Sequence, residues 1–131
     1  MEVVAALLLL SVALGVATPP MLRVLDDVAT YSAREEVAGL IADARVRAIA
    51  QGGAVVTIDS FRAASHSGAG ESRSVHLHSD FGVRVNTGAR GAVRLAYDAL
   101  GLGRVASATL VFERGRSQRT LVVSAYGRVR R

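Results

Sequence analysis

Two small sets of side chains in this 131-residue chain have the residue types of a reactive site. Asp59, Ser60 and His66 include the three types of a hydrolase triad, but no Gly-x-Ser-x-Gly turn surrounds the serine. His76 and His78 stand two residues apart and would share one face of a strand, an arrangement that can begin a metal site. No third ligand accompanies them in the sequence except His66, which we expect in a loop. We therefore predict a protein that is not an enzyme and that holds no cofactor or metal.

The arginines carry a stronger signal. The chain has 16 arginines, no lysine and 11 acidic residues, which gives a formal net charge of +5. Six of the arginines lie between Arg114 and the C-terminus with no acid among them, and Arg128, Arg130 and Arg131 fall in the last four residues. A guanidinium group directs two donors onto one anion, so this tail could bind phosphate. The alternative is a solvated tail, or arginines that cap strands and pair with acids of neighbouring subunits.

The length and the cysteine content limit the architecture. About 110 residues follow an apolar N-terminal segment, which is enough for one small domain with one core. The chain has no cysteine, so the sequence excludes both a disulfide framework and a thiolate zinc site. Gly101-Leu102-Gly103 is interpreted as a turn and not as a dinucleotide-binding loop, because no helix is expected after it.

The N-terminal segment is uncharged and apolar. Val3–Ala17 has no charged side chain, Glu2 precedes it, and Pro19 and Pro20 follow it. As a helix these 15 residues would span about 22 Å, against about 30 Å for a bilayer core. Apolar residues from Met21 to Leu25 extend the run. A cleaved signal peptide is the alternative, but it would need a basic residue before the apolar run.

An amphipathic stretch continues from Leu22 to Ile49. Its apolar residues recur at steps of mostly three and four, which predicts a helix that ends at Gly52-Gly53. Ser32 and Glu35 could form a capping box, which would break this helix near Tyr31. We expect one continuous helix because no proline intervenes.

The remainder predicts a β-rich head. We expect a loop over Phe61–Arg73, a turn at 101–103 and a polar turn over 114–118. Several short strands without a second helix favour an antiparallel sheet or a small sandwich. The fold class is therefore α+β, with a long helix packed on a small antiparallel head. The expected strands are Ala54–Ile58, Val75–His78, Val83–Val85, Ala92–Tyr97, Ala108–Glu113 and Thr120–Tyr126.

Three groups of residues resemble a known family. Met1-Glu2-Val3-Val4 and the leucines after them look like the middle of the prepilin signature, with Met1 at its variable position and Glu2 at its glutamate. Ala44–Ile49 with Val55–Ile58 is similar to the end of the long helix and the first strand of the GspH/FimT group of minor pilins and pseudopilins. The order of strands from Val93 to Gly127-Arg128-Val129-Arg130 resembles the C-terminal part of that group. Residues 61–90 carry no mark of the family.

The signature lacks its first residues, a glycine followed by Phe-Thr-Leu. The simplest interpretation places the true start upstream of Met1. The alternative is a chain that cannot be processed. In the first case a prepilin peptidase is an expected partner, and methylation of the new N-terminus is an expected modification. An unrelated membrane-anchored periplasmic domain remains as a third hypothesis.

The resemblance implies a structural subunit of a type II secretion system or a type IV pilus, with a role in protein secretion. Residues 1–20 would be the transmembrane and assembly half of the helix, and 21–131 the periplasmic head with the amphipathic half. Glu2 would pair with the N-terminal amine of a neighbouring subunit, and Pro19 would kink the helix. The expected location is single-pass in the inner membrane, and the expected partners are other pilin subunits, membrane lipid and the inner-membrane assembly platform.

The resemblance also implies an alternative function. In the FimT branch, a Gly-Arg-x-Arg tail is associated with binding DNA during its uptake, and Gly127, Arg128 and Arg130 match that form. Arg131 adds a further charge. The GspH branch can end in a similar way, so the tail does not separate a DNA-binding pilin from a secretion pseudopilin.

Overall fold

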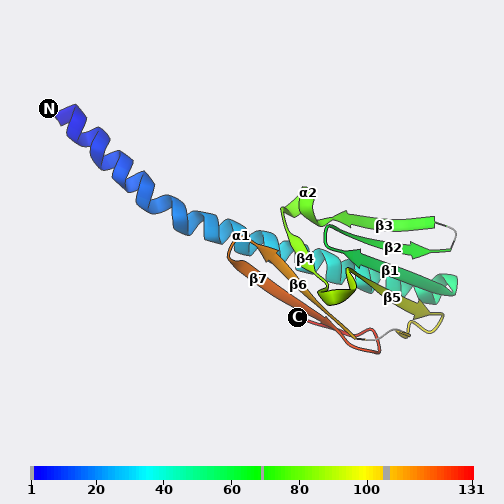
Figure 1. Ribbon diagram of the computed structural model, residues 1–131. Helices are drawn as coiled ribbons and strands as arrows, with labels where there is room; N and C mark the ends of the chain where they lie inside the picture. The colour runs from blue at the N-terminus through cyan, green and yellow to red at the C-terminus, as the bar shows by residue number, and fades with distance from the viewer. Residues whose placement is uncertain (1, 69, 105–106) are drawn as a thin grey trace.

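A computed structural model describes residues 2–68, 70–104 and 107–131 of the chain. One long helix lies along a head made of two small antiparallel sheets (Figure 1). The fold class is therefore α+β, as the sequence predicts. In chain order the elements are α1 (Glu2–Gln51), β1 (Gly53–Asp59), β2 (Arg62–Ser67), β3 (Gly70–His76), α2 (Leu77–Phe81), β4 (Arg84–Asn86), the 3-10 turn η1 (Gly88–Arg90), β5 (Ala92–Asp98), β6 (Ala108–Arg114), β7 (Ser117–Val123) and β8 (Val129–Arg130).

The first helix is continuous, as the apolar spacing predicts. It runs for 50 residues, or about 75 Å, with no break near Tyr31. The helical backbone also passes through Pro19 and Pro20. Figure 1 shows the N-terminal half projecting away from the head, while the C-terminal half forms one wall of it. The kink that we assign to Pro19 stays a prediction.

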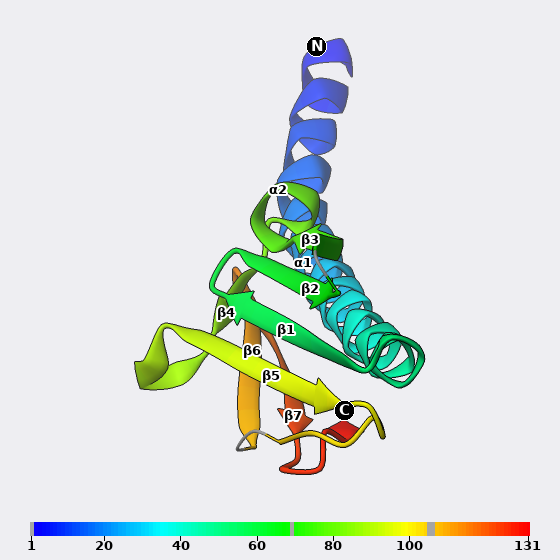
Figure 2. The same cartoon turned by 90° about the vertical axis from the view of Figure 1, so that its right-hand side faces the viewer.

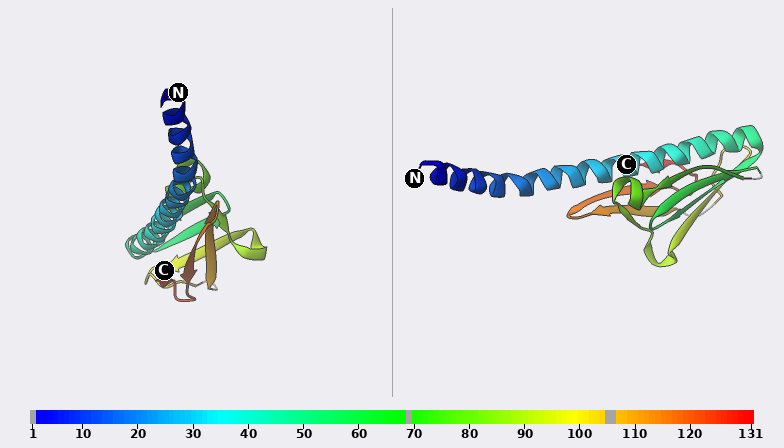
Figure 3. Two further views of the ribbon diagram at one scale, coloured as in Figure 1. Left: turned by 90° about the vertical axis from the view of Figure 1, so that its left-hand side faces the viewer. Right: turned by 90° about the horizontal axis from the view of Figure 1, so that it is seen from above.

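Each sheet has four strands, in the orders β3-β2-β1-β5 and β4-β6-β7-β8. Figure 2 shows that the strands of the second sheet run across the direction of the first. Seen from above, both sheets lie on the same side of α1 (Figure 3). The helix therefore packs against both sheets with one side.

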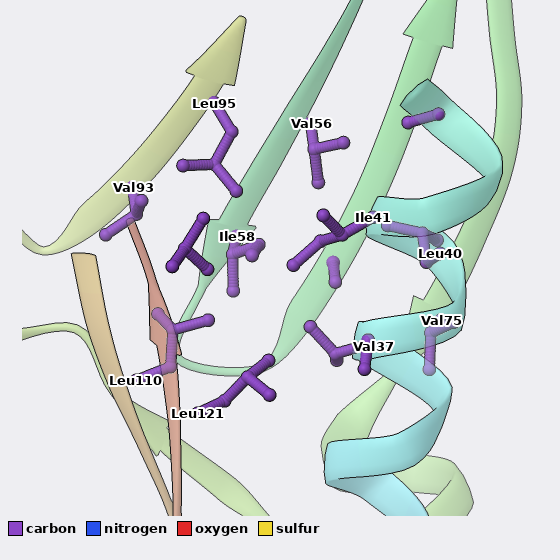
Figure 4. Close-up of a cluster of buried hydrophobic side chains, with 14 of the residues drawn as sticks. Val37, Leu40, Ile41, Val56, Ile58, Val75, Val93, Leu95, Leu110 and Leu121 are labelled. Atoms are coloured by element: carbon purple, nitrogen blue, oxygen red, sulfur yellow. The ribbon is translucent and has the colours of Figure 1, made fainter. Parts of the chain in front are cut away.

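The core forms where the helix meets both sheets. Val37, Leu40 and Ile41 of α1 are buried, and Figure 4 shows them facing the apolar side chains of the sheets. Alternate residues of the strands supply the other side of the core, because successive side chains of a strand point to opposite faces. Strand β5 shows the expected pattern, with Val93, Leu95 and Tyr97 buried. The buried partners from the other strands include Val56, Ile58, Val75, Leu110, Phe112, Leu121 and Val123.

The expected loop over Phe61–Arg73 is wrong. This region holds β2 and the first part of β3, which pair with each other, and β2 also pairs with β1. Its residues are mostly serine, alanine and glycine, which have low intrinsic strand propensity. The neighbouring strand β1 supplies the backbone partners, and Ala63 is fully buried in the core. Tertiary pairing therefore overrides the local composition here.

Three smaller boundaries also differ from the prediction. The strand expected over Val75–His78 ends at His76, because α2 begins at Leu77. The polar turn expected over 114–118 is only two residues long, since Arg114 pairs directly with Ser117. Gly115 makes this tight turn possible because its φ of +56° is a conformation that glycine adopts at no steric cost. The last strand expected to reach Tyr126 ends at Val123.

We expect Gly39→Ala to raise the stability of the head. Gly39 lies on the exposed side of α1, and a Cβ atom there would meet no other atom within 4 Å. Alanine in a helix interior is more stable than glycine by about 0.5–1 kcal/mol, because glycine loses more backbone entropy on folding. Calorimetry of the full chain in detergent would show a higher melting temperature. An unchanged or lower melting temperature would mean that this face of α1 is already in contact with something else.

Candidate functional site

The N-terminal half of α1 is a mainly apolar rod, and its described side chains from Glu2 to Gly15 and from Pro20 to Leu25 are exposed. The uncharged stretch Val3–Leu22 has 20 residues and would span about 30 Å, which matches a bilayer core. In the part of the chain that the structure describes, α1 has the length and the apolar composition that crossing a membrane requires. Contiguous apolar surface of this extent marks a membrane or protein contact. Its exposed large side chains are Val3, Val4, Leu7, Leu8, Leu9, Leu10, Val12, Leu14, Met21, Leu22, Val24 and Leu25.

Glu2 lies in the first turn of α1, at the tip of this rod, and is exposed. A carboxylate there interacts favourably with the positive end of the helix dipole. The described residues place no cation beside it in a single copy of the chain. Its pairing with a neighbouring subunit stays a prediction.

A polar joint fixes the head to α1 where the helix leaves it. Ser117 Oγ donates to Asp27 Oδ1 at 2.5 Å and lies 2.8 Å from Thr30 Oγ1. Nε of Arg114 lies 3.0 Å from Asp26 Oδ1, and Nη1 of the same side chain donates to the carbonyl of Phe81. Thr30 and Ser117 are buried, so the bond between them is shielded from water, and together these contacts hold the β6–β7 hairpin against the helix.

A second joint closes the opposite end of the head. Tyr97 is buried, and its hydroxyl donates to the carbonyl of Gly127 at 3.4 Å. Asp98 accepts the backbone N–H groups of Leu100 and Leu102, and these bonds, with Arg104, hold the pKa of its carboxyl below its usual value. The turn expected at 101–103 lies about three residues earlier, because the N–H of Gly101 donates to the carbonyl of Asp98 and Gly103 already pairs with Tyr97. The C-terminal tail is therefore attached to the end of β5.

We expect the second joint to become less stable as the pH rises into the alkaline range. Burial raises the pKa of Tyr97, and the charge of Arg45 offsets only part of this effect. A free tyrosine ionises near pH 10, so the unfolded chain loses the proton first and stability falls as the pH rises above about 10. We expect the melting temperature of the native chain to fall more steeply between pH 9 and 11 than that of Tyr97→Phe, measured by calorimetry. Parallel curves for the two proteins would contradict this prediction.

The three arginines of the tail have different surroundings. Arg131 forms an ion pair with Glu35 of α1 at 3.2 Å. Arg128 is exposed and lines a groove beside α1. Arg130 is exposed on β8 opposite Val122 of β7, which is itself on the open face of that sheet. Arg128 and Arg131 therefore line the same groove, and Arg130 is not among its lining residues.

The groove beside α1 has a volume of about 790 Å³. A second hollow of about 370 Å³ adjoins it, and the two share Arg45 and Arg128. The groove is lined on one side by Arg45, Val46 and Ile49 of α1 and on the other by Arg128, Val129 and Arg131 of the tail. Leu102 and Tyr126 line the second hollow. Sequence analysis did not identify Arg45, because only the fold brings it to the tail.

The other candidate residues are not brought into one site. Asp59 Oδ1 accepts the backbone N–H groups of Phe61 and Arg62, so this carboxylate caps the β1–β2 turn. His76 and His78 do not share a strand face, because His76 ends β3 and His78 lies in α2. Within the described ranges, no three histidine or carboxylate side chains gather as a metal site would require.

Comparison with known proteins gives a likeness in structure alone. No protein-family model matches the chain, and no curated protein matches it in sequence. Two crystal structures of the type IV minor pilin FimU from Pseudomonas aeruginosa strain PAO1 are similar to it. One has a TM-score of 0.58 and 19% sequence identity, and covers 76% of this chain and 90% of that chain. The other has a TM-score of 0.61 and 18% identity, and covers 76% of this chain and 85% of that chain.

Both likenesses extend over most of each chain, but the identities are low. They therefore bear on architecture and not on activity. The sequence predicts a long helix packed on a small antiparallel head, and the structure has α1 packed against two antiparallel sheets. The chain thus has the fold of a type IV minor pilin.

Proposed function

We propose that this chain is a pilin-like subunit of a membrane-anchored fibre, of the GspH/FimT type. The observation that carries the proposal is the exposed apolar half of α1, which continues without interruption into the spine of the head. Apolar surface of this extent is stable only in lipid or against other apolar surfaces. Before assembly the rod would lie in the inner membrane, and after assembly it would pack against the rods of other subunits.

The rest of the proposed assembly follows from this arrangement. The head would face the periplasm, and Glu2 would pair with the N-terminal amine of a neighbouring subunit. A carboxylate at the edge of hydrocarbon is costly unless it is paired, which favours such a role over an unpaired one. The subunit would act in a type II secretion system or a type IV pilus, and no bond is made or broken by it.

Membrane extraction and fibre shearing test this function. We expect the full chain to stay with the membrane at alkaline pH and to appear in the fibre fraction sheared from intact cells. Glu2→Gln should keep the membrane association but reduce the amount in fibres. Arg119→Gln, a substitution of an exposed residue on β7 outside both the rod and the groove, is the control for folding and expression. A chain that is released by alkaline extraction, or that never enters fibres, would contradict the proposal.

DNA binding is a second candidate function. It is favoured by one observation, that Arg128 and Arg130 are exposed and have no ion-pair partner among the described residues. It is weakened by the pairing of Arg131 with Glu35. The affinity of such a site would fall with salt, with a slope of about −0.9 for each phosphate contacted on duplex DNA.

The salt dependence of binding to duplex DNA tests this candidate. We expect the full chain in detergent to bind at low salt and the double variant Arg128→Ala/Arg130→Ala to lose that binding. The matched control is Arg90→Ala/Arg94→Ala, which removes the same charge from exposed positions elsewhere on the head. Equal loss in both double variants would mean that only net charge matters, and the tail would then have no specific role.

A further inference from the structure

We propose that the groove between α1 and the tail docks an acidic, apolar segment of a neighbouring fibre subunit. This inference rests on the proposed function, since it supposes that such neighbours exist. The groove is formed by the last turns of α1 and by the residues that follow Tyr126 (Figure 3 shows the C-terminus beside the helix). The apolar and charged residues at the groove determine which kind of segment could bind there.

The apolar component comes from side chains that the core of the head does not use. Val46 is 66% exposed, Ile49 58% and Tyr126 72%. The residues of α1 that face the sheets at the same level, Ala44 and Ala48, are fully buried. The helix therefore has a second apolar stripe on the side away from its own core. Covering such a stripe removes apolar surface from water and favours association.

The charged component is an excess of guanidinium groups at the border of the apolar surface. Arg45 and Arg128 have no ion-pair partner among the described residues. The nearby acid Asp43 is paired with Arg47 at 2.9 Å, and Glu35 is shared by Arg34 and Arg131. Two unpaired guanidiniums beside apolar side chains match a segment that carries carboxylates among apolar residues. A carboxylate accepts a bidentate pair of hydrogen bonds from arginine, and this pairing fixes register as well as adding attraction.

The position of the groove argues against a lipid surface as the occupant. Arg45 lies 20 residues after Leu25, where the exposed apolar rod ends, which is about 30 Å along the helix. Figure 1 shows this part of α1 at the end of the molecule opposite the N-terminus. A bilayer around the rod would not reach it. The apolar lining argues against nucleic acid, because a phosphate backbone gains nothing from contact with valine and isoleucine.

The test is photo-crosslinking of the full chain in cells that assemble the fibre. A photoreactive phenylalanine analogue replaces Val46 in the groove or, as the control, Val122 on the open face of β7. We expect the Val46 probe to form a cross-link with another fibre subunit, at a peptide that contains aspartate or glutamate. The Val122 probe should not give that product. Mass spectrometry of the cross-linked peptide identifies both partner and site.

Charge reversal then tests the chemistry. We expect Arg45→Glu/Arg128→Glu to reduce the Val46 cross-link at least tenfold, and reversal of the partner's acid to arginine to restore it. Reversing Arg119, which is exposed on β7 and outside the groove, should leave the cross-link unchanged. A cross-link that survives the double reversal, or one to lipid or DNA instead of protein, would overturn the inference.

The amount of the chain in sheared fibres separates the two proposals. Fibres that contain the chain but give no Val46 cross-link would overturn the docking inference and leave the subunit function standing. Absence of the chain from fibres would overturn both.

Discussion

Gly127→Ala is expected to unfold the C-terminal tail and to lower the stability of the head by roughly 3 kcal/mol or more. Gly127 has a φ of +73°, a conformation that costs a residue with a side chain about 1–2 kcal/mol. A Cβ atom there would also lie 2.4 Å from Cε1 of Tyr97. The ring cannot move aside easily because Tyr97 is buried, and Gly103 also lies close to the backbone of Gly127. The melting temperature should fall by more than about 12 °C for a head of this size.

Gly88→Ala is the matched control for this prediction. Gly88 has a φ of +74°, but a Cβ atom there would meet nothing within 4 Å. This variant measures the backbone cost alone, which we expect to be about 1–2 kcal/mol. If calorimetry gave the two variants equal melting temperatures, the contact between Gly127 and Tyr97 would not contribute. The same contact explains why the first residue of the Gly-Arg-x-Arg tail is a glycine.

Phe112→Ala is expected to destabilise the head by about 3–5 kcal/mol, the usual cost of removing a buried phenylalanine ring. Phe112 is fully buried on β6, which lies between β4 and β7. Val85 of β4 is its direct neighbour in the sheet and is also fully buried, so the strands cannot collapse easily into the cavity. This loss is a large part of the ~5–15 kcal/mol that stabilises a typical domain. Denaturant unfolding of the full chain in detergent would measure it.

Phe112→Leu separates loss of volume from loss of the ring. Leucine keeps much of the apolar volume, so we expect this variant to cost less than about 1.5 kcal/mol. Similar large losses in both variants would indicate that the shape of the ring is required. Negligible loss in Phe112→Ala would contradict the burial of this side chain.

The local sequence predicts the elements whose patterns are strong. Apolar steps of three and four residues from Leu22 onward, without a proline, predict a helix whatever surrounds them, and α1 is continuous to Gln51. Alternation over Ala92–Tyr97 likewise predicts β5, because one face of that strand is buried and the other is exposed. A charge-free N-terminal run predicts an apolar rod. These features depend on periodicity, which is a property of the chain itself.

Segments with weak local patterns take their structure from contacts with residues that are distant in the sequence. Strand β2 is built of alanine and serine, so its existence depends on hydrogen bonds to β1 and β3 and not on its own composition. His78 lies outside the expected strand because α2 begins at Leu77, which is buried. Contacts between residues far apart in the chain decide such cases, and no spacing rule records them.

The sequence by itself determined that this protein has an apolar N-terminal helix, an α+β head and an arginine-rich tail. Only the tertiary structure decided how that tail is used. It ties Arg131 to Glu35, directs Arg130 to the open face of a sheet and places Arg128 with Arg45 beside an apolar stripe. The physical reason is that Gly127 and Tyr97, 30 residues apart, pack together and turn the tail back along α1. Residue types state which charges exist, but the packing of distant residues determines which of them can act together.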